Sequence, residues 1–268
     1  MLMNNKLLFL FIFFVSLLSA ITPDSNAYAQ TDSPVVAAAS DLKFALEDIV
    51  VHFRADTKRE VRLAFGSSGN YFSQIGQGAP FQLFMSADED FVFRLHQAGK
   101  TEDRGALYAT GRIVLFAPKG SLLNVDNQMA GLKTALADSR ISRFAIANPE
   151  HAPYGRAAEQ ALRKLGLWEA LQGKVVLGEN VSQAAQFASS GSAQGGIFAY
   201  SLALSPSVSK LGTYVLLPEY LHQPLRQRMV LLKGAGENAR ALYAYLQQPA
   251  ARKIFTQYGF VLPVEASK

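Results

Sequence analysis

The chain has no cysteine among its 268 residues. Disulfide bonds, a C-x-x-C site and an acylated lipid anchor are therefore excluded. Histidine is scarce too, because only His52, His96, His151 and His222 occur and none has the spacing of metal ligands. The sequence therefore predicts no metal site. A chain of this length buries enough apolar surface to fold without disulfide bonds.

Only the N-terminus carries a long apolar run. Residues 7–18 are almost continuously apolar and follow a short segment with one cation, Lys6. Ala27-Tyr28-Ala29 then offers an A-x-A cleavage site before Gln30. We predict that residues 1–29 are a cleaved signal peptide, with a retained N-terminal anchor as the alternative, because the run is short for a membrane span. An exported chain without cysteines indicates a bacterial periplasmic protein.

Basic clusters and catalytic motifs are also missing. The net charge is +5, but the basic residues are scattered and form no stripe with aromatics, so we predict no nucleic-acid binding. Ser68 is not in a G-x-S-x-G motif, because Asn70 stands in place of the last glycine. No Walker A or H-E-x-x-H pattern is present. We therefore predict a protein that is not an enzyme and has no cofactor.

Strand-like and helix-like segments alternate along the mature chain. This alternation predicts an α/β fold with mostly parallel sheets flanked by helices. The expected strands are 34–38, 60–65, 82–86, 112–118, 144–148, 174–177, 195–198, 213–217 and 228–232. The expected helices are 42–53, 71–77, 89–98, 131–137, 156–165, 182–188, 238–247 and 250–258.

Two extended runs, residues 111–117 and 227–232, lack amphipathic alternation. Strands of this kind can carry the chain from one lobe into a second and back again. We predict that lobe one is discontinuous, with residues 30–111 and 228–268, and that residues 112–227 form lobe two. The two C-terminal helices would then pack on lobe one.

Four places where a strand runs into a helix are candidate anion sites, because the first N–H groups of a helix lack partners within it. The first is Ser40, which we predict to be an N-cap, with Asp41 in the first helical turn. Ser68 follows the second strand between two glycines that allow close approach of a ligand. Tyr154 begins the helix after a proline-shaped loop, and Val181 offers only its backbone amide.

Each junction has a simpler structural explanation. Ser67 or Ser68 could merely cap a helix, and Tyr154 could close its loop sterically. The fourth junction could be ordinary capping by Asn180 or Ser182. Four such junctions together favour a common site, because parallel strands end along the same edge of a sheet.

Six segments resemble the periplasmic molybdate-binding proteins of ABC transporters, a branch of the type II periplasmic binding proteins. They are residues 37–40, 65–68, 78–88, 148–155, 179–181 and 254–260. The resemblance implies that Ser40 and Ser68 offer hydroxyls and amides to the anion, and that Tyr154 and Val181 offer amides.

The chain departs from the family pattern at two positions. Gln82 replaces the aspartate that is usual in the G-A-P-x-D-L-F motif. A tyrosine that some members use as an extra donor falls at Ala199, with Tyr200 next to it. The resemblance therefore leaves two candidates for the last donor, Tyr200 and the hydroxyl of Tyr154.

The resemblance implies a monomeric two-lobed protein that closes over molybdate, or tungstate, and delivers it to a membrane permease. A site built only of donors suits a dianion that has four acceptor oxygens and no proton. The alternatives are the same fold with another ligand, such as sulfate or a small organic acid, and a ligand-sensing regulatory domain. An exported hydrolase using Ser68 is the remaining alternative.

Overall fold

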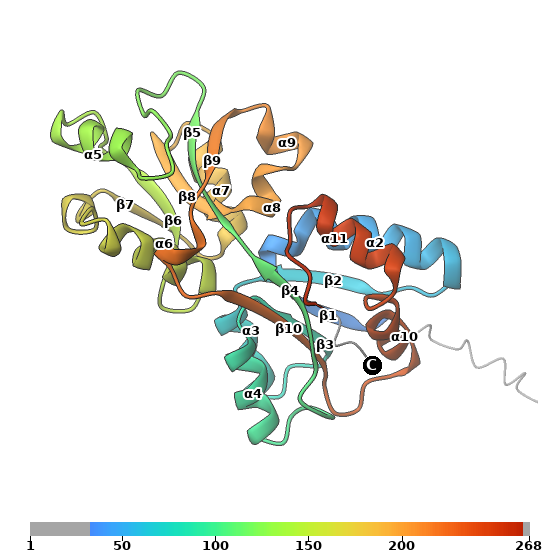
Figure 1. Cartoon of the computed structure of the whole chain (residues 1–268). Helices are drawn as coiled ribbons and strands as arrows, with labels where there is room; N and C mark the ends of the chain where they lie inside the picture. The colour runs from blue at the N-terminus through green and yellow to red at the C-terminus, as the bar shows by residue number, and fades with distance from the viewer. Residues whose placement is uncertain (1–32, 265–268) are drawn as a thin grey trace, which may run out of the picture. The chain divides into compact units, whose positions relative to one another are not determined.

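The computed structural model describes residues 33–264, which form two five-stranded sheets with helices packed against them (Figure 1). Each sheet with its helices is one lobe, so the two-lobed α/β fold expected from the sequence is confirmed. The predicted signal peptide, residues 1–29, lies outside the described residues. Within residues 33–264, every helix is too short or too polar to span a bilayer.

The sheet of lobe one contains β1 (Val35–Ala39), β2 (Arg62–Gly66), β3 (Phe81–Ser86), β4 (Ala106–Gly111) and β10 (Leu225–Leu231). Their order is β2-β1-β3-β10-β4. Strand β1 runs parallel to β2 and β3, whereas β10 runs antiparallel to β3 and β4. The three parallel strands all end at the edge where β1 and β2 lead into helical turns.

The sheet of lobe two contains β5 (Ile113–Pro118), β6 (Phe144–Ala147), β7 (Val175–Gly178), β8 (Gly195–Ala199) and β9 (Gly212–Leu216). Their order is β7-β6-β8-β5-β9, with β6 parallel to β7 and β8 and with β5 antiparallel to β8 and β9. Both sheets are therefore mixed, where the sequence predicted mostly parallel ones. The antiparallel pairs come from β10 and β5.

The helices include several short elements that the periodicity did not predict. The described helices are α2 (Lys43–Thr57), α3 (Ser68–Gly76), α4 (Glu89–Gln97), α5 (Ala130–Ala137), α6 (Pro153–Lys164), α7 (Val181–Ser189), α8 (Tyr200–Ala203), α9 (Pro206–Ser209), α10 (Glu237–Tyr245) and α11 (Pro249–Gln257). Three 3-10 turns are η1 (Ser40–Leu42), η2 (Glu169–Leu171) and η3 (Glu219–Leu221). Helices α8 and α9 were missed because four residues are too few to show a 3.6-residue period.

The chain passes from lobe one to lobe two between β4 and β5, with only Arg112 between the two strands, and returns between β9 and β10. Figure 1 shows β4 and β5 as one long crossing ribbon. The predicted return point, residue 228, lies inside β10. The domain boundaries 30–111, 112–227 and 228–268 stay a prediction.

The core of lobe one lies on both faces of its sheet. Strand β1 is apolar throughout because both of its faces are covered, with Val36 and Ala38 on one side and Ala37 on the other. Helices α2, α10 and α11 cover the first face, and α3 and α4 cover the second (Figure 1). The end of β1 is therefore fixed by packing on both sides.

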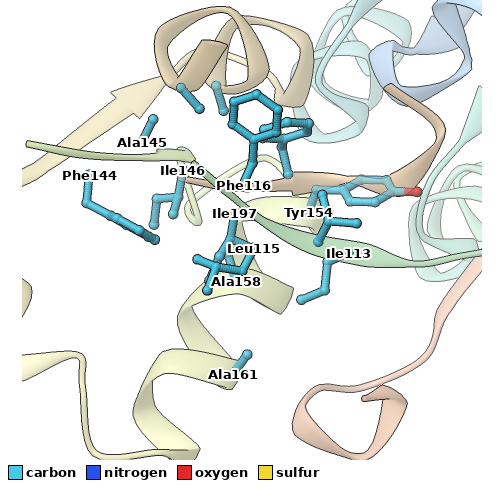
Figure 2. Packing of buried hydrophobic residues seen from close by; sticks show 14 of the residues in the cluster. Ile113, Leu115, Phe116, Phe144, Ala145, Ile146, Tyr154, Ala158, Ala161 and Ile197 are labelled. Carbon is cyan, nitrogen blue, oxygen red and sulfur yellow. The ribbon is translucent and has the colours of Figure 1, made fainter. Parts of the chain in front are cut away.

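A single apolar cluster fills lobe two. Ile113 and Leu115 of β5 pack there with Ile197 of β8 and with Ala158 of α6 (Figure 2). The ring of Tyr154 lies at the border of this cluster, and its hydroxyl oxygen points away from the apolar side chains (Figure 2). The cluster therefore holds the first turn of α6 in place while the tyrosine hydroxyl reaches a polar neighbour.

Candidate functional site

All four predicted site residues line the same small cavity between the lobes. Ser40 and Ser68 come from lobe one, and Tyr154 and Val181 come from lobe two. The remaining lining residues are Ala39, Asp41, Gly66, Ser67, Ala87, Ala152 and Pro153. The cavity measures about 10 Å³, which is room for about one water molecule, so a larger anion requires its walls to move slightly apart.

The backbone N–H groups of the four residues have no acceptor in the part of the chain that the structure describes. Each residue stands in the first turn of a helical element, where no carbonyl of the same helix is within reach. Within residues 33–264, no other group accepts a hydrogen bond from the N–H of Ser40, Ser68, Tyr154 or Val181. Buried N–H groups are normally paired, so these four are available to a ligand.

The two serine hydroxyls are held in place as acceptors. The backbone N–H of Ala87 donates to Ser68 Oγ over 2.9 Å, and that of Ser182 donates to Ser40 Oγ over 3.2 Å. In the described part of the chain, neither hydroxyl hydrogen has an acceptor. Each O–H is therefore free to donate, and together with the four N–H groups the cavity offers six donors.

The predicted N-cap at Ser40 is wrong. Ser40 begins the 3-10 turn η1, and helix α2 starts after Leu42 without a side-chain cap. The chain turns tightly between β1 and α2, and this turn leaves Ser40 Oγ facing α7 of the other lobe, where Ser182 donates to it. In the second junction it is Ser67 that caps α3, since the N–H of Asn70 donates to its Oγ over 3.3 Å.

The side chain of Asn180 caps α7, as one of the alternatives expected. The N–H of Gln183 donates to Asn180 Oδ1 over 3.1 Å. This cap leaves the N–H of the next residue, Val181, unpaired within the described chain. At this junction Asn180 therefore caps the helix, and the N–H of Val181 is still available to a ligand.

Hydrogen bonds to backbone carbonyls hold the two lobes together around the cavity. Ser182 Oγ donates to the carbonyl of Ser40 over 2.8 Å, and Ser201 Oγ donates to the carbonyl of Asp41 over 2.7 Å. On the other side, the N–H of Gly69 donates to the carbonyl of His151 over 2.9 Å. The cavity is therefore enclosed by direct contacts between the lobes.

A buried polar network lies beside the cavity. The hydroxyl of Tyr154 donates to Asp41 Oδ2 over 2.9 Å, and Nε2 of Gln227 donates to the same oxygen over 2.7 Å. The hydroxyl of Tyr108 donates to Gln227 Oε1 over 2.7 Å. Burial raises the pKa of Asp41 to about 6, although the hydrogen bonds from Gln227 and Tyr154 act in the opposite direction.

Neither tyrosine that was a candidate for the last donor is free to bind an anion in the cavity. The hydroxyl hydrogen of Tyr154 is used by Asp41, so only its N–H is available. Tyr200 does not line the cavity. Its ring lies 6.0 Å from that of Tyr214 and 4.9 Å from the guanidinium carbon of Arg112.

Gln82 lies in β3, away from the cavity, and its Oε1 accepts a hydrogen bond from the N–H of Gly236 over 2.8 Å. Gly236 precedes the first turn of α10. Gln82, which replaces the family's aspartate, therefore holds the start of α10 against β3 and does not line the cavity.

Replacing Gln82 by alanine is expected to lower the free energy of unfolding by about 1 kcal/mol, the net value of one hydrogen bond, and to leave ligand affinity unchanged. Urea unfolding and a binding titration of the purified variant measure the two effects. Gln74→Ala, on the exposed face of α3, is the matched control and should change neither. A loss of affinity in Gln82→Ala would contradict a purely structural role.

A larger groove of about 440 Å³ also runs between the lobes, but its lining does not suit an anion. The carboxylates of Asp88, Glu89 and Asp90 line it. Arg156 and Arg226, which line it too, are already paired with Asp88 and Glu89. Among residues 33–264, no group of three histidine or acidic side chains is arranged to hold a metal ion.

Comparison with known proteins places the chain among solute-binding proteins. The family model described as bacterial extracellular solute-binding protein matches residues 34–261. The molybdate-binding protein ModA of Azotobacter vinelandii is 37% identical over 237 residues, which cover 87% of this chain and 92% of that protein. ModA of Rhodobacter capsulatus is 36% identical over 230 residues, which cover 85% and 87% of the two chains.

A solved structure gives the same assignment. The periplasmic molybdate-binding protein of Azotobacter vinelandii matches with a TM-score of 0.78 and 32% identity, over 86% of this chain and 100% of that one. Sequence and fold therefore agree over nearly the whole described region. The chain belongs to the bacterial extracellular solute-binding protein family and, within it, groups with the periplasmic molybdate-binding proteins.

Proposed function

We propose that the protein captures molybdate, and also tungstate, in the cavity between its lobes and delivers it to the permease of an ABC importer. One observation carries this proposal: among the described residues, four backbone N–H groups and two serine hydroxyls without an acceptor belong to residues that line one cavity, and no lysine or arginine lines it. The names of the relatives, molybdate-binding proteins, support the choice of anion.

The donor set suits an anion that only accepts hydrogen bonds. Molybdate at neutral pH is a dianion with four acceptor oxygens and no proton, so O–H and N–H donors on several sides can satisfy it. Phosphate, which carries a proton at this pH, additionally needs an acceptor. The helix starts at Ser68, Tyr154 and Val181 add partial positive charge without a buried cation.

Capture requires the two lobes to separate and close again. Ser40 Oγ receives its orienting hydrogen bond from Ser182 of the other lobe, so this donor is aligned only when the lobes meet. Closure by a hinge motion at the two crossings would then complete the site and produce the shape that a permease recognises. The proposal includes export to the periplasm by the predicted signal peptide and action as a monomer.

We propose that the protein catalyses no reaction, although Ser67, His151 and Glu179 lie next to one another as the serine, histidine and acid of a hydrolase triad do. Ser67 Oγ lies 2.9 Å from His151 Nδ1, and His151 Nε2 lies 3.7 Å from Glu179 Oε2. The second distance is too long for a hydrogen bond. Ser67 Oγ already caps α3, and His151 and Glu179 belong to the opposite lobe. These contacts therefore support lobe closure.

Calorimetry on the purified protein tests the proposed ligand against its nearest alternative, sulfate. We expect sub-micromolar binding of molybdate and tungstate and no measurable heat with sulfate or phosphate. Closure would have to hold the donors of the two lobes at the spacing of the molybdate oxygens, and the smaller sulfate should then bind weakly. Absence of heat with both molybdate and tungstate would contradict the proposal, and tight binding of sulfate alone would favour the alternative.

A further inference from the structure

Asp41 is the one acidic residue that lines the donor cavity in the described chain, and it is only 1% exposed. Its Oδ2 accepts from Tyr154 and Gln227. Its Oδ1 is fully enclosed, and within residues 33–264 no donor reaches it. A buried carboxylate oxygen without a partner is costly unless it is protonated or paired.

Among the described residues, no cation contributes to the surroundings of Asp41 and balances its charge. Tyr154 of α6 and Tyr108 of β4 are the titratable groups of the network, and burial together with the negative charge of Asp41 holds the pKa of both phenols well above the usual range. Helix α7 carries no charged side chain, and α8 contributes only the Ser201 hydroxyl. Lys43, which follows two positions later in the chain, is paired with Glu47.

A dianion in the cavity adds like charge to this arrangement. Ser40, a donor to the anion, is the residue before Asp41, and both residues line the cavity. Two negative groups at such close range in a desolvated site cannot both stay fully charged without a large electrostatic cost, and protonation of the carboxylate removes it. Oδ1 has no donor among the described residues, so it can take the proton without breaking a hydrogen bond.

We propose that binding of the dianion is coupled to the uptake of one proton by Asp41, so that the closed site holds the anion beside a neutral carboxyl group. The proton comes from solvent, and the only covalent bond that forms is the O–H bond of Asp41. This inference rests on the proposed anion site and specifies its charge balance.

The coupling fixes the direction of the pH dependence. In the closed structure without an anion, burial raises the pKa of Asp41 to about 6, so well below this pH the carboxyl group is already protonated and binding takes up no proton. The bound anion raises the pKa further, so above about pH 6 binding must draw a proton from solution. Affinity is therefore constant below about pH 6 and falls as the pH rises above it, by up to about tenfold per pH unit.

The test is calorimetry with molybdate from about pH 6 to about pH 8, repeated in two buffers of different ionisation enthalpy. The wild-type protein should take up close to one proton per anion at neutral pH, and its dissociation constant should rise with pH. Asp41→Asn keeps an oxygen for Tyr154 and Gln227 and should abolish both effects. Asp138→Asn, which removes an exposed carboxylate beyond α5, should behave like wild type.

A second pair of variants tests whether Asp41, and not another titratable group, takes up the proton. Tyr154→Phe removes a hydrogen bond that lowers the pKa of Asp41, so the onset of the pH dependence should move to higher pH. His151 contacts Ser67, which lines the cavity, so His151→Gln must leave the proton uptake in place if Asp41 is the group that takes up the proton.

Molybdate binding with equal heat in both buffers and a flat pH profile would overturn the inference and leave the anion site intact. The inference also fails if proton uptake persists in Asp41→Asn, or if Tyr154→Phe leaves the pH profile unmoved. Failure to bind molybdate at every pH would overturn the proposed function together with the coupling.

Discussion

Replacing Ser40 and Ser68 together by alanine is expected to weaken molybdate binding by about 2–6 kcal/mol, which is roughly 30-fold to more than 10⁴-fold in dissociation constant. Each hydroxyl is oriented by a backbone N–H and has its hydrogen free for the anion. Leaving a buried charged acceptor without one donor costs about 1–3 kcal/mol, and the double variant removes two. Calorimetry measures the loss.

The single variants and a matched serine complete this experiment. Ser40→Ala and Ser68→Ala should each cost about half of the total, since the two donors come from separate segments of lobe one. Ser73→Ala, on the exposed side of α3, should bind like wild type. Wild-type affinity in both single variants would show that the anion does not occupy this cavity.

The four cavity residues could be predicted because each belongs to a local pattern. A buried apolar strand followed at once by a helical period marks a junction, and the N–H groups of its first turn have no partner in the helix. The position of the residue in that pattern is enough, whichever side chain it carries. This is why Val181, whose side chain has no polar atom, was found as readily as Ser40.

The buried network around Asp41 could not be predicted in the same way. The local pattern placed Asp41 in a first helical turn, a position that does not imply burial. Its burial depends on Tyr154, which lies 113 positions later in the chain, and on Gln227, which lies 186 positions later. Gln227 gave no signal of burial in the sequence, since it lies between Arg226 and Arg228 in β10, and only the structure shows that its side chain is fully buried.

The strand directions also lay beyond the local pattern. Alternating strands and helices predicted parallel pairing, and β1, β2 and β3 follow that rule. Strands β5 and β10 enter their sheets from the other lobe, so their direction is set by where the crossing starts. An apolar segment fits a buried strand in either direction, so its sequence does not indicate whether the strand pairs parallel or antiparallel.

Replacing Gly69 by alanine is expected to weaken molybdate binding by about 1–3 kcal/mol, or roughly 5- to 150-fold, without destabilising the lobes. A Cβ atom at this position would lie 2.5 Å from the carbonyl oxygen of His151 in the opposite lobe. Alanine favours the helix α3 itself over glycine. The clash therefore acts on closure, and the apparent affinity falls with the fraction of molecules that can close.

Gly76→Ala provides the matched control, because it lies in the same helix and its Cβ would meet nothing within 4 Å. It should keep wild-type affinity, while both variants should unfold at the same or higher urea concentration than wild type. Small-angle scattering with molybdate present should show Gly69→Ala more open than Gly76→Ala. Equal affinity and equal compactness would mean that the contact between Gly69 and His151 is not needed for the closed state, and that the donors on the two lobes meet the anion without it.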